Sequence, residues 1–199
     1  MNKVKAFTTV VVLLLVLGPL AGQDFAGEKN NRLFFMSEMV YLSGVGNVTF
    51  EDTKVSNDGF AARMKLIVAY HINEHFSGGL GVGFDGYFDP AYYILPIFID
   101  IKGYLKDNNT TPFAFLDLGY APGITDNFGK GLMTNFGIGY RLYVGLGKKA
   151  LLLPNVGLNL QKIQKDRREI ETNQFPPQLV TVEDNITLSS ISIGLTVVY

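Results

Sequence analysis

Apolar and polar residues alternate with a period of two along most of this 199-residue chain. The pattern is clearest near the C-terminus, where Ile191, Ile193, Leu195 and Val197 alternate with serine, glycine and threonine. A period of two is that of a β-strand with one apolar face. No stretch after residue 23 is long and apolar enough to cross a membrane as a helix. The sequence therefore predicts an all-β protein.

Eight antiparallel strands of about ten residues are predicted from this alternation. They cover residues 33–43, 59–71, 76–87, 95–105, 113–121, 132–144, 152–161 and 189–199. The first has mixed parity and is oriented by turning Glu38 inward. Connections alternate between short turns, near residues 73, 107–111 and 147–149, and longer polar segments, at 44–57, 86–94, 122–130 and 162–185. Short turns at one end and long loops at the other predict an up-and-down transmembrane β-barrel.

The polar faces of these strands carry glycine and charges of both signs. Four acidic and four basic residues are predicted to form a paired network in the lumen: Glu38, Asp85, Asp100, Asp117, Arg63, Lys65, Lys102 and Arg141. Equal numbers of opposite charges indicate mutual neutralisation in a confined space, because buried charges must be paired. An eight-stranded barrel has an interior that side chains can fill. The charges are therefore placed inside and the apolar faces outside.

Aromatic residues support this choice of face. With the parity above, two groups fall on the outward face near its two ends: Tyr41, Phe60, Phe88, Tyr93 and Tyr120 near the long loops, and Phe35, Tyr70, Phe76, Tyr140 and Tyr199 near the short turns. An aliphatic band lies between them, formed by Val82, Ile99, Leu116, Ile138 and Leu195. Two aromatic girdles around an aliphatic band are typical of a membrane-spanning barrel.

The N-terminal segment has the pattern of a secretory signal. Lys3 and Lys5 precede an apolar run over residues 8–17, which Gly18 and Pro19 interrupt. The run is too short for a membrane-spanning helix but suits a signal peptide. We therefore expect residues 1–22 to be a cleaved signal peptide and residues 23–199 to be the barrel domain.

The composition excludes several classes of function. The chain has no cysteine, which removes disulfides and thiolate metal sites. Its net charge is −1, so no overall field attracts nucleic acid. No cofactor or metal is predicted.

The segments FSGGLGVGFDGYF, LPIFIDIKGYL and TPFAFLDLGYA, together with a final strand that ends on an aromatic residue, resemble the small eight-stranded outer-membrane barrels of Gram-negative bacteria. The resemblance covers most of residues 30–199. It implies a location in the cell outer membrane, contact with its lipid, and assembly by the barrel-assembly machinery. It also implies that Tyr199 is the assembly signal, although phenylalanine is more usual at that position.

Two motifs are interpreted as structural. Gly79, Gly81 and Gly83 alternate with apolar residues inside a strand, so they pack in the lumen and do not form a phosphate-binding loop. His71 and His75, the only histidines, lie at the first short turn, where we expect both on the surface. A lipid-modifying barrel enzyme would carry a histidine at the other end, so this resemblance does not extend to the enzymes.

The sequence predicts a non-enzymatic surface barrel with a largely filled lumen. Segment 162–185 is the candidate for binding an extracellular partner, because loops on rigid scaffolds carry function. Three alternatives stay open: a narrow porin-like channel, an enzyme acting on outer-leaflet lipid, and a soluble periplasmic ligand-binding barrel with its apolar face inside.

Overall fold

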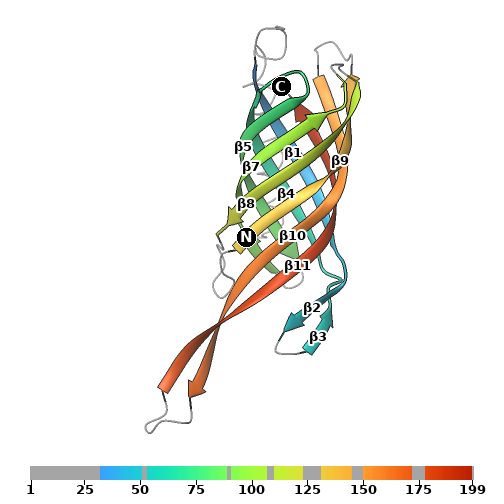
Figure 1. Ribbon diagram of the computed structural model, residues 1–199. Coiled ribbons are helices and arrows are strands. Elements are labelled where there is room, and N and C mark those ends of the chain that lie inside the picture. Colours follow the sequence, from blue (N-terminus) through green and yellow to red (C-terminus); the bar gives the residue numbers. More distant parts are fainter. Residues whose placement is uncertain are drawn as a thin grey trace, which may run out of the picture.

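The computed structural model describes residues 32–50, 53–88, 91–106, 110–122, 131–144, 150–171 and 178–198 (Figure 1). Almost all of them lie in strands: β1 (Leu33–Gly44), β2 (Asn47–Phe50), β3 (Thr53–Ser56), β4 (Phe60–His71), β5 (Phe76–Phe88), β6 (Ala91–Ile94), β7 (Ile97–Tyr104), β8 (Thr111–Ala121), β9 (Gly131–Val144), β10 (Ala150–Glu171) and β11 (Gln178–Val198). Among these residues there is no helix long and apolar enough to cross a membrane.

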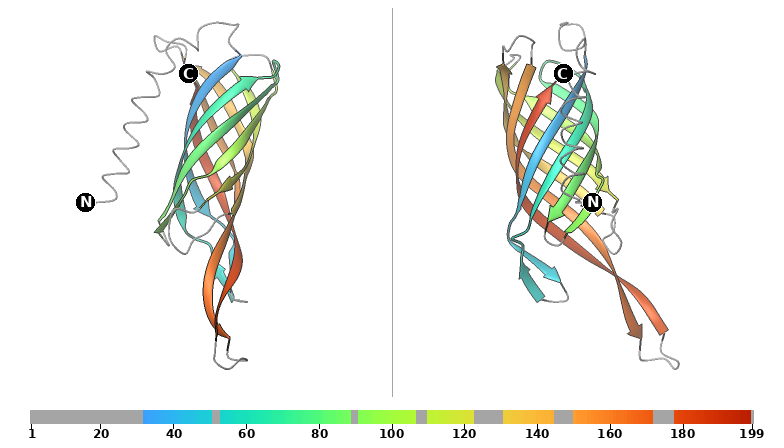
Figure 2. Two further views of the ribbon diagram at one scale, coloured as in Figure 1. Left: turned by 90° about the vertical axis from the view of Figure 1, so that its left-hand side faces the viewer. Right: turned by 180° about the vertical axis from the view of Figure 1, so that it is seen from behind.

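The main sheet closes on itself. Its neighbours run β4, β1, β11, β10, β9, β8, β7 and β5, and β5 returns to pair with β4. Every pairing is antiparallel. The first and last strands join through Met36 opposite Val198 and Gly44 opposite Ser190. The views in Figure 2 show the resulting tilted barrel.

Strands β6 and β7 together occupy one strand position of the barrel wall, and we call each such position a stave. Ile94 lies opposite Asp85 and Ile97 lies opposite Val82, so both strands keep one register against β5. Pro96 interrupts the ladder because proline has no backbone N–H to donate. Its carbonyl still accepts a hydrogen bond of 2.7 Å from the Gly83 amide. The barrel therefore has eight staves, which confirms the predicted fold.

The short turns and the described chain ends lie at one end of the barrel. Leu33, the first residue of β1, lies opposite Tyr70 near the end of β4. In the turn over residues 72–75, the Asn73 side-chain oxygen accepts hydrogen bonds of 2.8 Å from the amides of His75 and Phe76. Asparagine stabilises tight turns in this way. The other two predicted short turns lie wholly or partly outside the described residues.

Two of the predicted long loops were wrong in form. Segment 44–57 contains the hairpin of β2 and β3. Segment 86–94 is mostly strand, because β5 continues to Phe88 and pairs with β6 from Ala91. Tyr87 and Tyr92, which are cross-strand partners, stack with ring centroids 4.2 Å apart. This aromatic pair favours strand over loop.

Segment 162–185 was also wrongly predicted to be a loop. Strands β10 and β11 stay paired from Leu151 opposite Val198 to Glu171 opposite Gln178. We call residues 164–171 and 178–185 the ribbon. It extends beyond the other strands at the long-loop end (Figures 1 and 2). Residues 165–169 are five consecutive charged residues, so this segment has no apolar alternation that would reveal a strand in the sequence.

Inward-facing glycines make room for large aromatic side chains. A Cβ atom at Gly81 would lie 2.3 Å from the Phe98 ring. At Gly139 it would lie 2.4 Å from the Phe113 ring, and at Gly137 it would lie 2.9 Å from the Phe115 ring. The glycine pattern of the sequence therefore specifies where rings fill the lumen.

We expect Gly119→Ala to destabilise the barrel by about 1 to 3 kcal/mol, as overpacking does. The new Cβ would lie 2.4 Å from the Ile97 carbonyl oxygen, and this backbone atom cannot move aside. Gly103→Ala is the matched control, because its Cβ would approach only the Phe76 ring, at 3.4 Å. Urea unfolding in lipid vesicles measures both, and equal effects would contradict the packing argument.

Candidate functional site: the barrel wall and the charged lumen

The outer wall of the barrel is apolar. Exposed side chains in its middle include Val82, Ile99, Ile138 and Leu195, and Ile99 exposes 52% of its surface. Exposed aromatic side chains lie toward both ends: Tyr41, Phe60, Phe88 and Tyr120 near the long loops, and Tyr70, Phe76 and Tyr140 near the short turns. Water would not stabilise so continuous an apolar surface. The wall has the organisation of a barrel that spans the outer membrane.

The eight predicted lumen residues all face inward. Seven of them are buried, with at most 4% of each residue exposed, and Arg141 is half-buried. Ion pairs join the seven buried residues. Their interior placement follows from parity, because every one lies between two outward-facing neighbours.

Arg63 and Asp85 form the most complete pair. They are cross-strand partners on β4 and β5. The Arg63 Nε donates to Asp85 Oδ1 at 2.7 Å and its Nη2 donates to Asp85 Oδ2 at 2.6 Å. The remaining Nη1 donates to Asn159 Oδ1 on β10 at 2.9 Å. This bidentate pair with an added amide ligand links strands across the lumen.

Lys65 connects two carboxylates from different strands. Its Nζ lies 3.1 Å from Glu38 Oε2 and 2.6 Å from Asp117 Oδ2. The Nδ2 of Asn155 donates to Glu38 Oε1 at 2.9 Å, and that of Asn135 donates to Asp117 Oδ2 at 3.0 Å. Five strands are joined here: β4, β1 and β8 through the ammonium group and its two carboxylates, β10 through Asn155, and β9 through Asn135.

Asp100 and Lys102 pair within β7, two residues apart. Asp100 is also the cross-strand partner of Asp117, so two carboxylates lie side by side and each depends on its own lysine. The Arg141 guanidinium lies over the Tyr104 ring, 4.8 Å from its centroid. This cation–π contact holds Arg141 at the short-turn side of the network.

Apolar residues occupy the lumen on both sides of the charged layer. Toward the long loops lies the cluster of Val40, Leu42, Ala61, Tyr87, Tyr92, Ile94, Ala121 and Ile163. Toward the short turns lies that of Tyr104, Phe113, Phe115 and Leu153. A third cluster of buried side chains inside the barrel contains Phe34, Met36, Ile67, Ala69, Phe98 and Met133. The charged layer is thus enclosed by packed apolar side chains.

Sequence reasoning missed the neutral members of this network. Asn135, Asn155 and Asn159 supply its amide groups, and the Ser192 hydroxyl donates to Asn135 Oδ1 at 3.2 Å. The two-residue alternation of the sequence already placed these residues on the inward faces of their strands. The usable signal was asparagine at inward positions of strands, where it is otherwise disfavoured.

The two histidines differ in their surroundings. His71 is half-buried and faces the interior, where it stacks on Phe34 with ring centroids 4.3 Å apart. The expectation that it lies on the surface was wrong. His75 is exposed in the turn. Across the described part of the chain, no three histidine or acidic residues gather as metal ligands.

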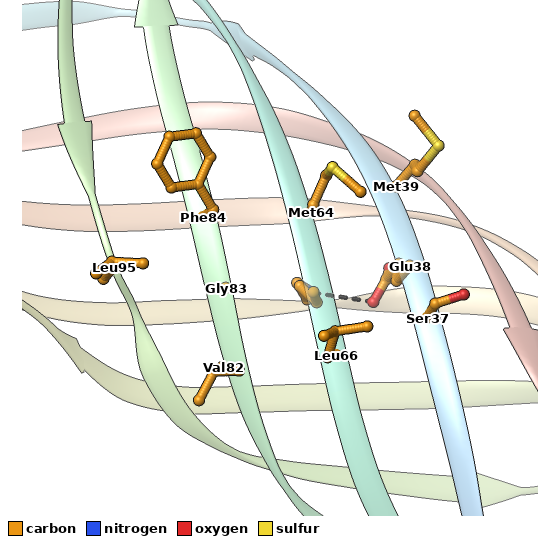
Figure 3. Close-up of a pocket in the computed structure, with 10 residues that line it drawn as sticks. Ser37, Glu38, Met39, Met64, Leu66, Val82, Gly83, Phe84 and Leu95 are labelled. Carbon is orange, nitrogen blue, oxygen red and sulfur yellow. Dashed lines mark hydrogen bonds and ion pairs between the residues drawn. The ribbon is translucent and has the colours of Figure 1, made fainter. Parts of the chain in front are cut away.

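A groove of about 190 Å³ lies on the outer wall, across β1, β4, β5 and the start of the β7 stave. Met39, Met64, Leu66, Val82, Phe84 and Leu95 line it, together with Glu38 and Lys65, and Figure 3 shows these side chains on neighbouring strands. Because it opens on the apolar wall, it faces lipid and is not a passage for polar solutes.

The predicted signal peptide and the predicted assembly signal Tyr199 lie outside the described residues. Both stay predictions.

Comparison with known proteins gives a likeness of fold alone. The sequence matches no protein-family profile and no curated protein. Outer membrane protein AlkL aligns at 11% identity and a TM-score of 0.47, over 87% of this chain and 93% of that one. OprG from Pseudomonas aeruginosa aligns at 12% and 0.48, over 84% and 95%. The outer membrane enzyme PagL aligns at 12% and 0.47, over 80% and 97%.

We expect a fluorophore at Ile99→Cys to be quenched by a lipid-soluble quencher and protected from a water-soluble one. The side chain lies in the middle of the apolar wall, and the absence of native cysteine makes the label specific. Glu74→Cys, in the exposed turn, is the control and should show the reverse. Protection of position 99 from the lipid quencher in vesicles would rule out the assignment of faces.

We expect Asp85→Asn to lower the free energy of unfolding by about 3 to 5 kcal/mol, because Arg63 would lose its counter-charge while staying buried. Replacing the pair together, by Arg63→Met with Asp85→Leu, should recover much of this loss. Asp58→Asn, an exposed change, should alter stability by less than about 0.5 kcal/mol. Strictly additive effects of the Arg63 and Asp85 changes would show that the pair contributes nothing.

Proposed function

We propose that this eight-stranded outer-membrane barrel is a non-enzymatic, non-conducting surface protein that anchors the ribbon outside the membrane for partner binding. The observation that carries the proposal is the filled lumen. Seven charges are tied into ion pairs, and packed apolar clusters lie on both sides of them. A barrel whose interior is filled by packed side chains has no room there for a pore, so we expect its function to lie in its surface segments.

A narrow channel is the second candidate, since charges of both signs line the interior. Conduction would require the Arg63 and Lys65 ion pairs to open and the apolar clusters to part. Dry apolar constrictions oppose ion passage. The packing therefore favours the closed barrel over the channel.

An enzyme acting on outer-leaflet lipid has less support. Both histidines of the chain lie at the short-turn end, which is the periplasmic end in this class of barrel. General acid–base chemistry on the outer leaflet would then depend on carboxylates, lysines or tyrosines. The buried carboxylates of the lumen are held by cations and do not face the lipid.

Assembly completes the proposal. We assign the C-terminal aromatic residue Tyr199 as the signal read by the barrel-assembly machinery, and outer-membrane lipid as the partner of the apolar wall. Deletion of Tyr199 should then slow insertion in cells without changing the stability of the barrel refolded in vesicles.

We expect the purified barrel to give no ion-conductance steps in planar bilayers and to leave vesicles impermeable to small solutes. A large-pore porin reconstituted alongside serves as the positive control. Heat-modifiable migration in gels verifies that the inserted protein is folded. Reproducible conductance from the folded barrel would overturn the proposed function in favour of a channel.

A further inference from the structure

The buried part of the charged layer contains one acid more than it contains bases. Arg63 and Asp85 balance each other, and both side chains are fully buried. The other buried charges belong to three carboxylates and two ammonium groups, which we call the five-charge cluster: Glu38, Asp100, Asp117, Lys65 and Lys102. Arg141 is only half-buried and lies over the Tyr104 ring. A buried charge without compensation is costly, so the excess acid needs an explanation.

Two of the three carboxylates face each other. Asp100 on β7 and Asp117 on β8 lie directly opposite in the register, and they expose 1% and 0% of their surface. Residues at directly opposite positions of an antiparallel pair bring their side chains together on one face. Here that face is the lumen. Like charges this close oppose each other's ionisation.

One oxygen of each carboxyl group is left over. Asp100 Oδ2 accepts from the Lys102 ammonium group, and Asp117 Oδ2 accepts from both Lys65 and Asn135. The two Oδ1 atoms are buried, and neither has a hydrogen-bond partner among the described residues. A buried acceptor without a partner is rare in folded proteins. The two unpartnered atoms belong to the two residues that face each other.

One proton accounts for both observations. Two carboxylates cannot hydrogen-bond to each other because both are acceptors only, whereas a protonated carboxyl group has an O–H that donates. A single proton between the two Oδ1 atoms gives each of them a partner. It also leaves the five-charge cluster with two positive and two negative charges.

We propose that Asp100 and Asp117 share one proton in the folded barrel, through an O–H···O hydrogen bond between their Oδ1 atoms, with Asp100 as the protonated member. Asp117 accepts from two donors at its other oxygen and Asp100 accepts from one, so the ionised form is stabilised more at Asp117. The charged layer is then a proton-binding site. This inference goes beyond the proposed surface function and does not depend on it.

Every strand around the pair is accounted for. Strand β5 presents Gly79 opposite Asp100, and β9 presents Asn135 opposite Asp117, so neither neighbour adds a charge. The charged groups that act on the pair are Lys102 on β7, Lys65 and Arg63 on β4, and Glu38 on β1. All of them belong to the buried layer already counted.

A proton fits this place better than a metal ion or a water molecule. Hard cations take about six oxygen ligands, whereas two unpartnered carboxylate oxygens face each other here. A water molecule can bridge two acceptors, but it would leave the excess charge uncompensated. The proton supplies both the hydrogen bond and the charge.

The shared proton makes folding depend on pH. A solvated aspartate is ionised at about pH 5, so the unfolded chain lacks the proton that the folded barrel holds. Raising the pH then favours the unfolded chain. For one proton, the folding equilibrium constant falls about tenfold for each unit of pH until the folded pair also releases it.

Infrared spectroscopy tests for the proton directly. The full chain is folded into lipid vesicles at about pH 5, and the C=O absorption of protonated carboxyl groups is recorded. The spectrum of the wild type minus that of Asp100→Asn should contain a protonated carboxyl band. The difference against Asp58→Asn, an exposed change, should contain almost none. Absence of the band from the first difference would overturn the proposal and leave a bridging water or a bound cation as the occupant.

The pH dependence of stability gives a second test. Asp100→Asn imitates the protonated acid, because its amide N–H can donate to Asp117 and its oxygen can accept from Lys102. Urea unfolding in vesicles measures the folding equilibrium constants of the wild type and this variant. Their ratio should fall about tenfold per pH unit around pH 5. A ratio that stays constant with pH would overturn the shared proton.

Asp117→Asn is the matched variant that tests which residue carries the proton. It should lower the folding equilibrium constant at least about tenfold more than Asp100→Asn does, because Lys65 and Asn135 would lose the carboxylate to which both donate. Equal losses from the two substitutions would overturn the assignment of the proton to Asp100.

Discussion

Backbone hydrogen bonding in an apolar solvent is the constraint on which this structure depends. Lipid offers no partner to a peptide N–H or C=O, so each strand in the membrane must be paired on both sides. Closure of β1 on β11 meets this requirement and removes every free edge within the barrel wall. Pro96 lies in the barrel wall but lacks the backbone N–H that strand pairing uses. It interrupts the ladder between β6 and β7, yet the stave keeps its register because the Pro96 carbonyl still accepts from Gly83.

Closure with eight staves fixes how wide the interior is, and the side chains then have to fill it. The chain uses two complementary fillings. Aromatic rings lie over inward glycines, as Phe98 does over Gly81, and long charged side chains reach across to partners on other strands, as Lys65 does to Asp117. Charges alone would be costly in this space, and asparagine amides add to their hydrogen bonding. Glu38 illustrates this, because it receives both Lys65 and Asn155.

The sequence predicted the parts of the structure that depend on local alternation. Glu38, Asp85 and Arg141 were placed inward by parity alone, as found in the structure. Alternation could not predict which acidic residue pairs with which basic residue, because this depends on the register of the strands. Asp117 binds Lys65 across the barrel, whereas the nearby Lys102 binds Asp100. The ribbon was missed for a different reason. Polarity was taken to indicate a loop, but a strand outside lipid has no apolar face to reveal it.

The ribbon shows what happens where the membrane constraint ends. Among the described residues, β10 pairs with β9 only as far as Gln161, and β11 pairs with β1 only as far as Ser190. Water can satisfy the freed backbone groups there, which lipid could not. The two strands nevertheless continue in the register that they hold within the barrel.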